Sequence, residues 1–484
     1  VDWIGHKLYW SNPKQQLIIR GNLNGSQQEP LPILTVAKEL NIDAVEGFIY
    51  WSTGHAVESS RLNGKHKKTY YPAELFSGKQ VMGLTIDMDS RTVYWIVRSY
   101  EGSSLFRAST ADKLKVGEEI LPQKVSSLQY PNMQGPLCYF DNHLVWLRDD
   151  RYAVIGDMKG QNSAVLSGMS LSGLNMVAIL DSALHYSPRG RKLSEVNVIP
   201  QPISQQSLRV EGTFEEFKIC WNPVHNVNYG LVFYEIKIRN LNKKDITRET
   251  VEPFWIYESP NELVPYSPLF VSVRAQTYWG ASSSARALLH SPPSIPSQPT
   301  NPRVFVSYNR NPVEEDQEII AVFRWDAPVS PNGVIVKYQV SFWLDSSDLQ
   351  VTELSASTME YVVPELPPNS TIYFKVAACT DVGCSVSTSP VLGDSGVETP
   401  VPRLLLSTSD TVQITDYDKK ENHTLSRSGS VIDIAYSSHD DRVYWIDDNN
   451  HLITSNFYTS DKTKLLSLNN SALCLAVDWV GRFL

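Results

Sequence analysis

Short stretches in which apolar and polar residues alternate recur along this chain of 484 residues. Residues 207–238 (SLRVEGTFEEFKICWNPVHNVNYGLVFYEIKI) and 319–344 (IIAVFRWDAPVSPNGVIVKYQVSFWL) are clear examples. Alternation with a period of two is typical of strands that bury one face. The composition agrees, because 12 Trp, 23 Tyr and 29 Pro favour short strands and turns. The length suggests about three domains, and we predict that they are built mainly of β structure.

A pair of neighbouring residues, usually Tyr followed by Trp, recurs after an apolar residue in the first part of the chain. It occurs at Tyr9, Tyr50, Tyr94 and Val145, and in a decayed form at His185, with spacings of 41, 44, 51 and 40 residues. This period is expected when each unit is a four-stranded propeller blade. In three units an Asp stands seven positions before the pair, where its carboxylate can accept backbone amides in the turn before the strand. The residues of this blade motif are Asp2, Tyr9, Trp10, Asp43, Tyr50, Trp51, Asp87, Tyr94 and Trp95.

A second set of such units begins near Arg403. Its aromatic pair is Tyr444 and Trp445, and the closing octet VDWVGRFL repeats five of the eight residues of the opening octet VDWIGHKL. Both sets resemble YWTD-type β-propeller blades of low-density-lipoprotein-receptor relatives, which have six blades. The resemblance implies that residues 1–199 form about five blades of a propeller that is incomplete at its N-terminus. It also implies that residues 403–484 form the first blades of a further propeller.

The residues between the two sets follow a different pattern of alternating strands. Both halves, 200–291 and 297–399, resemble fibronectin type III domains, which are seven-stranded sandwiches with a buried Trp between the sheets. The resemblance assigns this core position to Trp221 and Trp325. Leu269 and Ile372 occupy the place where that family usually has its corner Tyr, so the corner hydrogen bond is in doubt. The proline-rich stretches SPPSIPSQPT and VETPVPR are expected to be short, stiff connectors.

The order of the modules resembles the ectodomain of the Ros/Sevenless receptor tyrosine kinases. The stretches YWST, VESSRLNG and FSGKQVMGLTID, followed by RVEGTFEEFKICWN, are similar to that family's vertebrate members. The resemblance implies the extracellular side of a single-pass plasma-membrane glycoprotein, with a cytoplasmic kinase that lies outside this chain. It implies an extracellular protein ligand, which for vertebrate members is a secreted EGF-repeat protein of the NELL type and for the insect member a cell-surface protein. The segment itself is expected to be non-enzymatic and to hold no cofactor.

Two other functions remain open from the sequence. An endocytic or sorting receptor can also combine YWTD propellers with fibronectin domains, and a secreted propeller enzyme would need polar residues gathered at the propeller centre. The chain has no GxxxxGK[ST], GxGxxG, HExxH, CxxC, HRD or DFG motif. Its net charge of −9 argues against nucleic acid or an anionic membrane as a partner. We therefore prefer the receptor segment, with the sorting receptor as the alternative.

Cysteines and glycosylation sequons are the remaining candidates for chemistry. Cys379 and Cys384 bracket a four-residue turn and are either a disulfide or two free thiols. N-glycosylation sequons stand at Asn24, Asn369, Asn422 and Asn469. No residue is expected to be catalytic or to bind a metal, and the ligand-binding residues cannot be read from the sequence.

Several local patterns have both a functional and a structural interpretation. The acidic pairs at 149–150, 440–441 and 447–448 could serve acid catalysis or calcium, but their turn positions favour solvated or hydrogen-bonded residues. GMSLSG at 168 misses the spacing of a nucleophile elbow. The run KHKK at 65–68 is either a heparin-like contact or, as we prefer, an exposed loop. Trp279, in TYWGASS, is either an anchor for a partner or locally packed.

Overall fold

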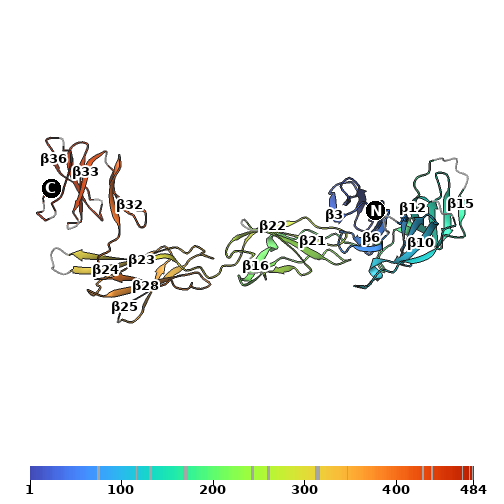
Figure 1. Cartoon of the computed structure of the whole chain (residues 1–484), viewed down its shortest axis with the longest axis horizontal. Coiled ribbons are helices and arrows are strands. Elements are labelled where there is room, and N and C mark those ends of the chain that lie inside the picture. The colour runs from blue at the N-terminus through green and yellow to red at the C-terminus, as the bar shows by residue number, and fades with distance from the viewer. Residues whose placement is uncertain are drawn as a thin grey trace. The chain divides into compact units, whose positions relative to one another are not determined.

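The computed structural model describes most of the chain: residues 1–72, 77–115, 117–129, 133–166, 173–240, 245–258, 262–310, 317–345, 347–427, 430–437, 440–459, 461–470, 472–478, 480–481 and 483–484. Within these ranges every element is a strand, apart from four three-residue 3-10 turns (Figure 1). These turns are η1 (Ala111–Lys113), η2 (Ser182–Leu184), η3 (Leu193–Glu195) and η4 (Gln205–Ser207). The predicted all-β fold is confirmed. No helix in the described part of the chain has the length and apolar composition needed to cross a membrane.

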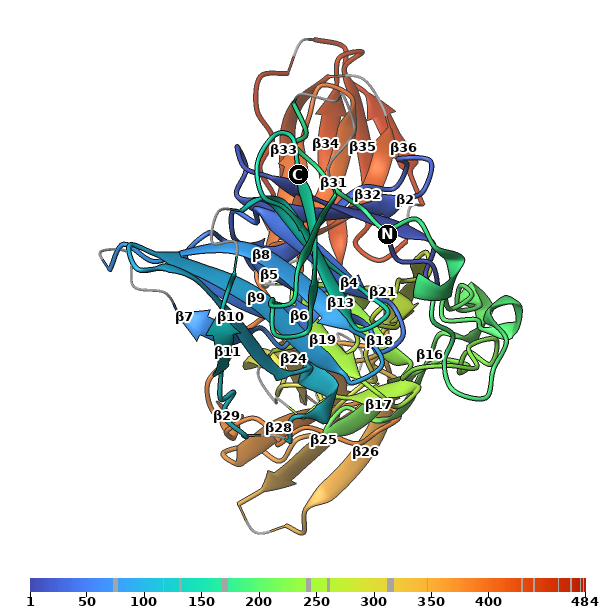
Figure 2. The ribbon, with the colours of Figure 1, turned by 90° about the vertical axis from the view of Figure 1, so that its right-hand side faces the viewer.

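Four antiparallel sheets precede residue 170, and each is made of strands that follow one another in the chain. Figure 2 shows β8, β9, β10 and β11 of the third sheet side by side. The first strands of the second, third and fourth sheets are in contact with one another in series, as the inner strands of adjacent blades would be. The strands are β1 (Lys7–Asn12), β2 (Leu17–Asn22) and β3 (Glu29–Leu34); β4 (Glu39–Asp43), β5 (Phe48–Ser52), β6 (Ala56–Arg61) and β7 (Lys68–Pro72); β8 (Gln80–Asp87), β9 (Thr92–Ser99), β10 (Gly102–Ser109) and β11 (Gln123–Ser127); and β12 (Gln134–Phe140), β13 (His143–Leu147), β14 (Ala153–Asp157) and β15 (Ala164–Leu166).

The repeated aromatic pair packs between neighbouring sheets. Because side chains alternate along a strand, the two rings of a pair point to opposite faces of their sheet. Trp51 lies in one cluster with residues of the first sheet, whereas Tyr50 shares a cluster with Trp95 of the third sheet. In the same way, Tyr94 shares a cluster with Trp146 of the fourth sheet. The pairs Tyr50/Trp51 and Tyr94/Trp95 therefore each link their own sheet to the one before and the one after.

The sequence predicts about five blades, but its decayed fifth unit, at His185, forms no strand in the described part of the structure. The described residues between 173 and 208 form only 3-10 turns and extended chain, so four sheets rather than five precede residue 200 there. His185 instead stacks on Trp3, with ring centroids 5.1 Å apart, and Trp3 donates to the Tyr186 carbonyl at 2.9 Å. The Tyr186 hydroxyl donates to Asp89 at 3.1 Å. The residues at the pair position thus contact turns of the first and third sheets instead of forming a strand.

Two sandwiches follow, each with a three-stranded and a four-stranded sheet around one core. Trp221 is 2% exposed and Trp325 1% exposed, so both lie deep in these cores. Leu269 and Ile372 are also buried there, and their hydrocarbon side chains pack where a corner Tyr would stand. The strands of the first sandwich are β16 (Arg209–Thr213), β17 (Glu216–Cys220), β18 (Phe233–Asn240), β19 (Ile246–Thr250), β20 (Phe254–Ile256), β21 (Pro268–Gln276) and β22 (Ala285–His290). Those of the second are β23 (Thr300–Arg310), β24 (Gln317–Asp326), β25 (Lys337–Leu344), β26 (Gln350–Ser355), β27 (Glu360–Val363), β28 (Thr371–Cys379) and β29 (Val391–Asp394).

Two further sheets complete the described chain, and the second has four strands like the early ones. Their shared cluster contains Trp445, which is fully buried. The strands are β30 (Arg403–Ser407), β31 (Thr411–Asp416) and β32 (Glu421–Arg427), then β33 (Val431–Ser437), β34 (Arg442–Asp447), β35 (His451–Asn456) and β36 (Thr463–Ser467). The whole chain divides into two compact units, Val1–Leu263 with Ser267–His290, and Val264–Tyr266 with Ser291–Leu484.

Candidate functional site at the module junctions

The Asp of the blade motif closes the turn that leads into the strand of the aromatic pair. The carboxylate of Asp2 accepts the amides two and three residues further on, at 3.0 and 2.8 Å. Asp87 does the same at 2.9 and 3.0 Å, and Asp43 accepts the amide three residues on at 3.1 Å. Asp478 of the closing octet repeats this turn, at 3.1 and 2.8 Å. The similarity of the two octets therefore reflects one turn structure.

An arginine joins the turns of the second and third sheets. Arg91 stands four positions after Asp87, and its Nη2 donates to Asp43 Oδ2 at 2.5 Å and to Asp112 Oδ1 at 2.6 Å. Asp43 is fully buried. Burial alone would lower the pKa of Arg91, but the hydrogen bonds to Asp43 and Asp112 outweigh it and raise that pKa above its usual value. Arg91 therefore provides a charged link between neighbouring sheets.

The corresponding link between the first and second sheets is missing. The position four residues after Asp43 is Gly47, whose φ of +73° suits glycine. No side chain extends from this position toward Asp2, and within the described residues Asp2 Oδ2 is buried without a hydrogen-bond partner. Burial raises the pKa of Asp2 to about 6, although its hydrogen bonds from the turn amides act in the opposite direction. The first two sheets thus leave a space beside two glycines, Gly5 and Gly47.

Trp279 of the first sandwich fills this space. It lies between β21 and β22, is 3% exposed, and its indole Nε1 donates to the carbonyl of Ala44 at 2.6 Å. A Cβ added at Gly47 would lie 3.2 Å from the indole ring, and one at Gly5 would lie 3.0 Å from the Cβ of Trp279. The backbone of the first two sheets therefore lies close against Trp279 at both glycines, and at Gly47 the neighbour is the indole ring itself. Of the two interpretations of Trp279 from the sequence, the structure supports packing within the chain, although the contacts are with residues more than 200 positions away.

Polar and cationic side chains surround the tryptophan. The guanidinium of Arg61 lies 4.3 Å from the ring centroid of Tyr278, and Arg20 donates to the Tyr278 carbonyl at 3.0 Å. The Tyr229 hydroxyl donates to the Val45 carbonyl at 3.0 Å. These contacts involve several elements on both sides, so the first sandwich is held against the first two sheets in more than one direction.

The buried Asp2 should make the first unit more stable in mild acid. Its folded-state pKa of about 6 lies above the usual value of 3.8, so the folded state binds the proton more tightly. The stabilisation is complete below the unfolded-state pKa and is lost as the pH rises through about 6. We expect the Asp2 contribution to fall by about 1 kcal/mol between pH 5 and pH 7.5.

Thermal unfolding at both pH values would measure this contribution, with Asp2→Asn as the control. Asn can still accept the turn amides but does not titrate, so the difference between the pH profiles of the two proteins isolates Asp2. Identical pH profiles would contradict the assignment.

The second unit contains a different junction, built from charges. Arg324, on β24, is 4% exposed and donates to Glu360 at 2.6 Å and to Asp416 at 2.7 Å. Arg303, on β23, makes two hydrogen bonds to Asp418, at 2.6 and 2.8 Å. Burial alone would raise the pKa of both aspartates, but the arginines lower it below its usual value. The turn between β31 and β32 is thus fixed to the second sandwich.

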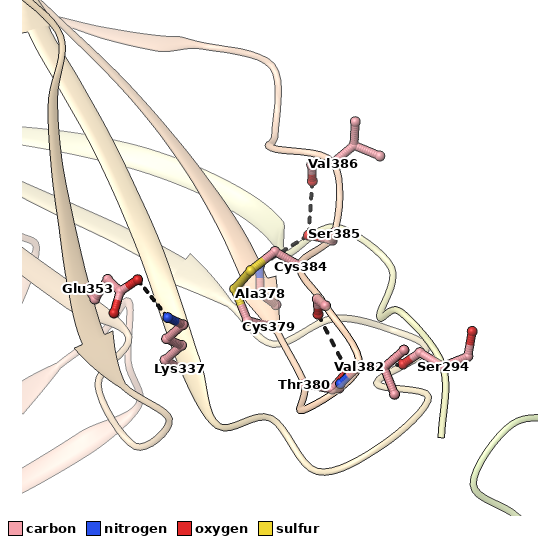
Figure 3. The surroundings of a disulfide bond; sticks show 11 residues. Ser294, Lys337, Glu353, Ala378, Cys379, Thr380, Val382, Cys384, Ser385 and Val386 are labelled. Atoms are coloured by element: carbon pink, nitrogen blue, oxygen red, sulfur yellow. Dashed lines mark hydrogen bonds and ion pairs between the residues drawn. A yellow bond between two sulfur atoms is a disulfide. The ribbon is translucent and has the colours of Figure 1, made fainter. Parts of the chain in front are cut away.

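The structure joins Cys379 and Cys384 in a disulfide at the end of β28 (Figure 3). Cys138, Cys220 and Cys474 are free thiols. The four sequon asparagines, Asn24, Asn369, Asn422 and Asn469, are all exposed, as a modified residue must be.

The other sequence candidates have structural roles where they are described. Asp149 and Asp447 accept backbone amides of their own turns, and Asp440 accepts the Ser437 hydroxyl. In the basic run, Lys65 is paired with Glu249 and Lys67 with Glu58. Residues 168–172 of GMSLSG lie outside the described residues. The described residues contain no group of three or more His, Cys, Asp or Glu side chains arranged to hold a metal ion.

Comparison with known proteins finds relatives over the whole chain. Proto-oncogene tyrosine-protein kinase ROS of Gallus gallus is 28% identical over 509 residues, which cover 100% of this chain and 21% of that protein. The Homo sapiens protein of the same name is 25% identical over 494 residues, with the same coverage. Protein sevenless of Drosophila virilis is 25% identical over 504 residues, covering 99% of this chain and 19% of that protein. The chain thus spans about a fifth of the length of these curated relatives.

A family model and two solved structures also match parts of the chain. The Fibronectin type III domain model matches residues 313–393, in the second sandwich. The match to a chain of a nidogen/laminin complex covers 36% of this chain and 65% of the matched chain, at 17% identity and a TM-score of 0.29. The FN1-FN3 domains of chicken CNTN1 cover 54% and 99% at 15% identity, with a TM-score of 0.22. At these TM-scores the two structures add nothing to the fold described above.

Proposed function

We propose that this chain, a homologue of the Ros and Sevenless receptor tyrosine kinases over its whole length, is the ligand-binding and spacing segment of such a receptor. In this proposal it lies on the extracellular side of the plasma membrane and transmits the binding of a protein ligand to a cytoplasmic kinase elsewhere in the polypeptide. The segment is not itself an enzyme and holds no cofactor. A secreted EGF-repeat protein of the NELL type is the ligand that we would test first.

The observation that carries this proposal is the match to ROS and Sevenless from one end of the chain to the other. A match limited to the sandwiches would be expected of any protein with fibronectin domains. Full coverage instead supports a shared order of sheets and sandwiches. Order of modules is a property of a particular receptor type, whereas a fold alone does not imply a function.

The junction geometry supports the spacing role. Trp279 joins the early sheets to the first sandwich, and the two arginines join the second sandwich to the sheets after it. Within a unit, modules that share buried contacts of this kind keep a fixed relative orientation better than modules joined only by flexible linkers. Ligand binding at one module would then move its unit as a body, and rearranged or clustered ectodomains would bring the kinase domains together.

We further propose that residues 1–199 form part of a six-bladed YWTD propeller and that 403–484 begins another. The serial contacts of β4, β8 and β12 and the repeated Asp turn support this arrangement. The two sandwiches would then be the fibronectin domains 200–291 and 297–399. The exposed sequons would carry N-glycans, in keeping with an extracellular location.

Deletion of this segment from the intact receptor tests the function. We expect ligand-stimulated autophosphorylation to be lost when residues 1–484 are removed and surface expression is unchanged. A deletion receptor that reaches the surface and still responds fully to ligand would contradict the proposal. Insertion of a glycine-rich linker of matched contour length separates simple shortening from loss of the folded modules.

A further inference from the structure

The disulfide between Cys379 and Cys384 closes a tight loop at the end of β28. The two residues face each other across an isolated antiparallel bridge, with their Cα atoms 3.9 Å apart. Inside the loop, the amide of Thr380 donates to the carbonyl of Gly383 at 2.9 Å. The bond therefore restrains a four-residue turn, 380–383, whose Val382 side chain is 47% exposed.

This loop contacts the proline-rich stretch that leads into the second sandwich. The Thr380 hydroxyl donates to the carbonyl of Ser294 at 3.2 Å, and Thr380 is only 4% exposed. Figure 3 shows Ser294 beside this turn. A Cβ added at Gly383 would lie 3.5 Å from Ile295, which places the turn in van der Waals contact with the next residue of the stretch.

A second loop, 330–333, is hydrogen-bonded to the same stretch. The amide of Ser294 donates to the Asn332 carbonyl at 2.8 Å, and the Asn332 side chain donates to the Ile295 carbonyl at 2.8 Å. The amide of Ser297 donates to the Ser330 carbonyl at 2.9 Å. The two loops and the stretch therefore share one network of hydrogen bonds, in which the backbone of 294–297 provides both donors and acceptors.

We propose that the disulfide-closed loop 379–384 and the loop 330–333 form a clamp that fixes the direction in which the chain enters the second sandwich. Gly333 lies where the parts meet, because a Cβ there would be 3.0 Å from Thr380 and 3.2 Å from Pro293. The disulfide adds a covalent restraint to a short turn that the hydrogen bonds of Thr380 already hold in part. A covalent bond that closes a loop removes many of these alternatives.

Hydrogen exchange on the intact chain tests the clamp through two amides, those of Ser294 and Ser297. In the Cys379→Ala/Cys384→Ala variant we expect both amides to exchange at least about tenfold faster than in the unaltered protein. Their hydrogen bonds should open more often, because the neighbouring turn is no longer restrained by the disulfide. Thr380→Val, which keeps the disulfide and removes only the hydroxyl, should accelerate exchange at Ser294. The amide of Ser395, bonded to the Ser370 carbonyl at 3.0 Å in the same sandwich, is the internal reference.

Two results would overturn the proposal. One is unchanged exchange at Ser294 and Ser297 in the double alanine variant while the turn 380–383 itself exchanges faster. The other is unchanged exchange at Ser294 in Thr380→Val. If the double variant exchanges faster at Ser395 as well, it is unfolded, and selective reduction of the disulfide in the unaltered protein replaces it in the comparison.

Discussion

Replacing Trp279 with alanine is expected to split the unfolding of the first unit into two transitions. In the unaltered protein the early sheets and the first sandwich share the buried indole, so we expect them to unfold together. Removing a fully buried aromatic side chain costs about 3–5 kcal/mol, and here the loss falls on the junction. Differential scanning calorimetry of the chain would show the sandwich and the sheets unfolding at separate temperatures.

A matched control for this change is Trp343→Ala. Trp343 lies on the second sandwich, is only partly buried and stacks on Tyr373 with ring centroids 5.3 Å apart. Its removal should lower the stability of the second unit slightly and leave the first unit unchanged. A Trp279→Ala protein whose first unit still unfolds in one transition, with a loss below about 1 kcal/mol, would contradict the junction as described.

Replacing Arg324 with alanine is expected to detach the sheet β30–β32 from the second sandwich. The change removes the charged partner of Asp416 at a partly buried site and leaves Glu360 with Lys419 alone. We expect this to cost about 3 kcal/mol. Amide hydrogen exchange across β31 and β32 should accelerate. Raising the salt concentration should also accelerate this exchange in the unaltered protein, but to a smaller extent, because salt screens the ion pairs. Calorimetry of the second unit gives the free energy directly.

Lys337→Ala is the appropriate control, because the Lys337–Glu353 pair is exposed, with side chains 39% and 55% accessible. Such a pair should contribute no more than about 1 kcal/mol. Equal effects of the two substitutions would mean that the arginine cluster is an ordinary surface ion pair and not a junction.

The blade motif could be read from the sequence because it depends on local spacing. An Asp seven positions before an aromatic pair defines a turn and a strand, and the turn forms in the same way at Asp2, Asp87 and Asp478. The resemblance to fibronectin type III domains likewise assigned Trp221 and Trp325 to the sandwich cores, where they lie. Local patterns of this kind predict local structure well because hydrogen bonds within a turn and the pleat of a strand involve only neighbouring residues.

The junctions could not be predicted in the same way. The role of Trp279 depends on Gly47, more than 200 residues earlier in the chain, and on the absence there of an arginine like Arg91. A comparison of the units would have shown this substitution, but not which side chain fills the space. In the sequence, Asp416 and Asp418 look like ordinary acidic turn residues. Only the structure shows that Arg303 and Arg324 are their partners. The decayed unit at His185 kept the period of a blade without the aromatic pair, and it did not form a strand.

Binding of the glycosylated receptor ectodomain to candidate NELL-type ligands, measured by biolayer interferometry, tests the central claim most directly. The comparison is with an ectodomain that lacks residues 1–484 and whose remaining modules are shown to be folded. We expect the deletion to abolish binding, since the proposed function requires the recognition surface to lie within this segment. Retained binding with unchanged affinity would contradict that claim and reduce the segment to an architectural spacer.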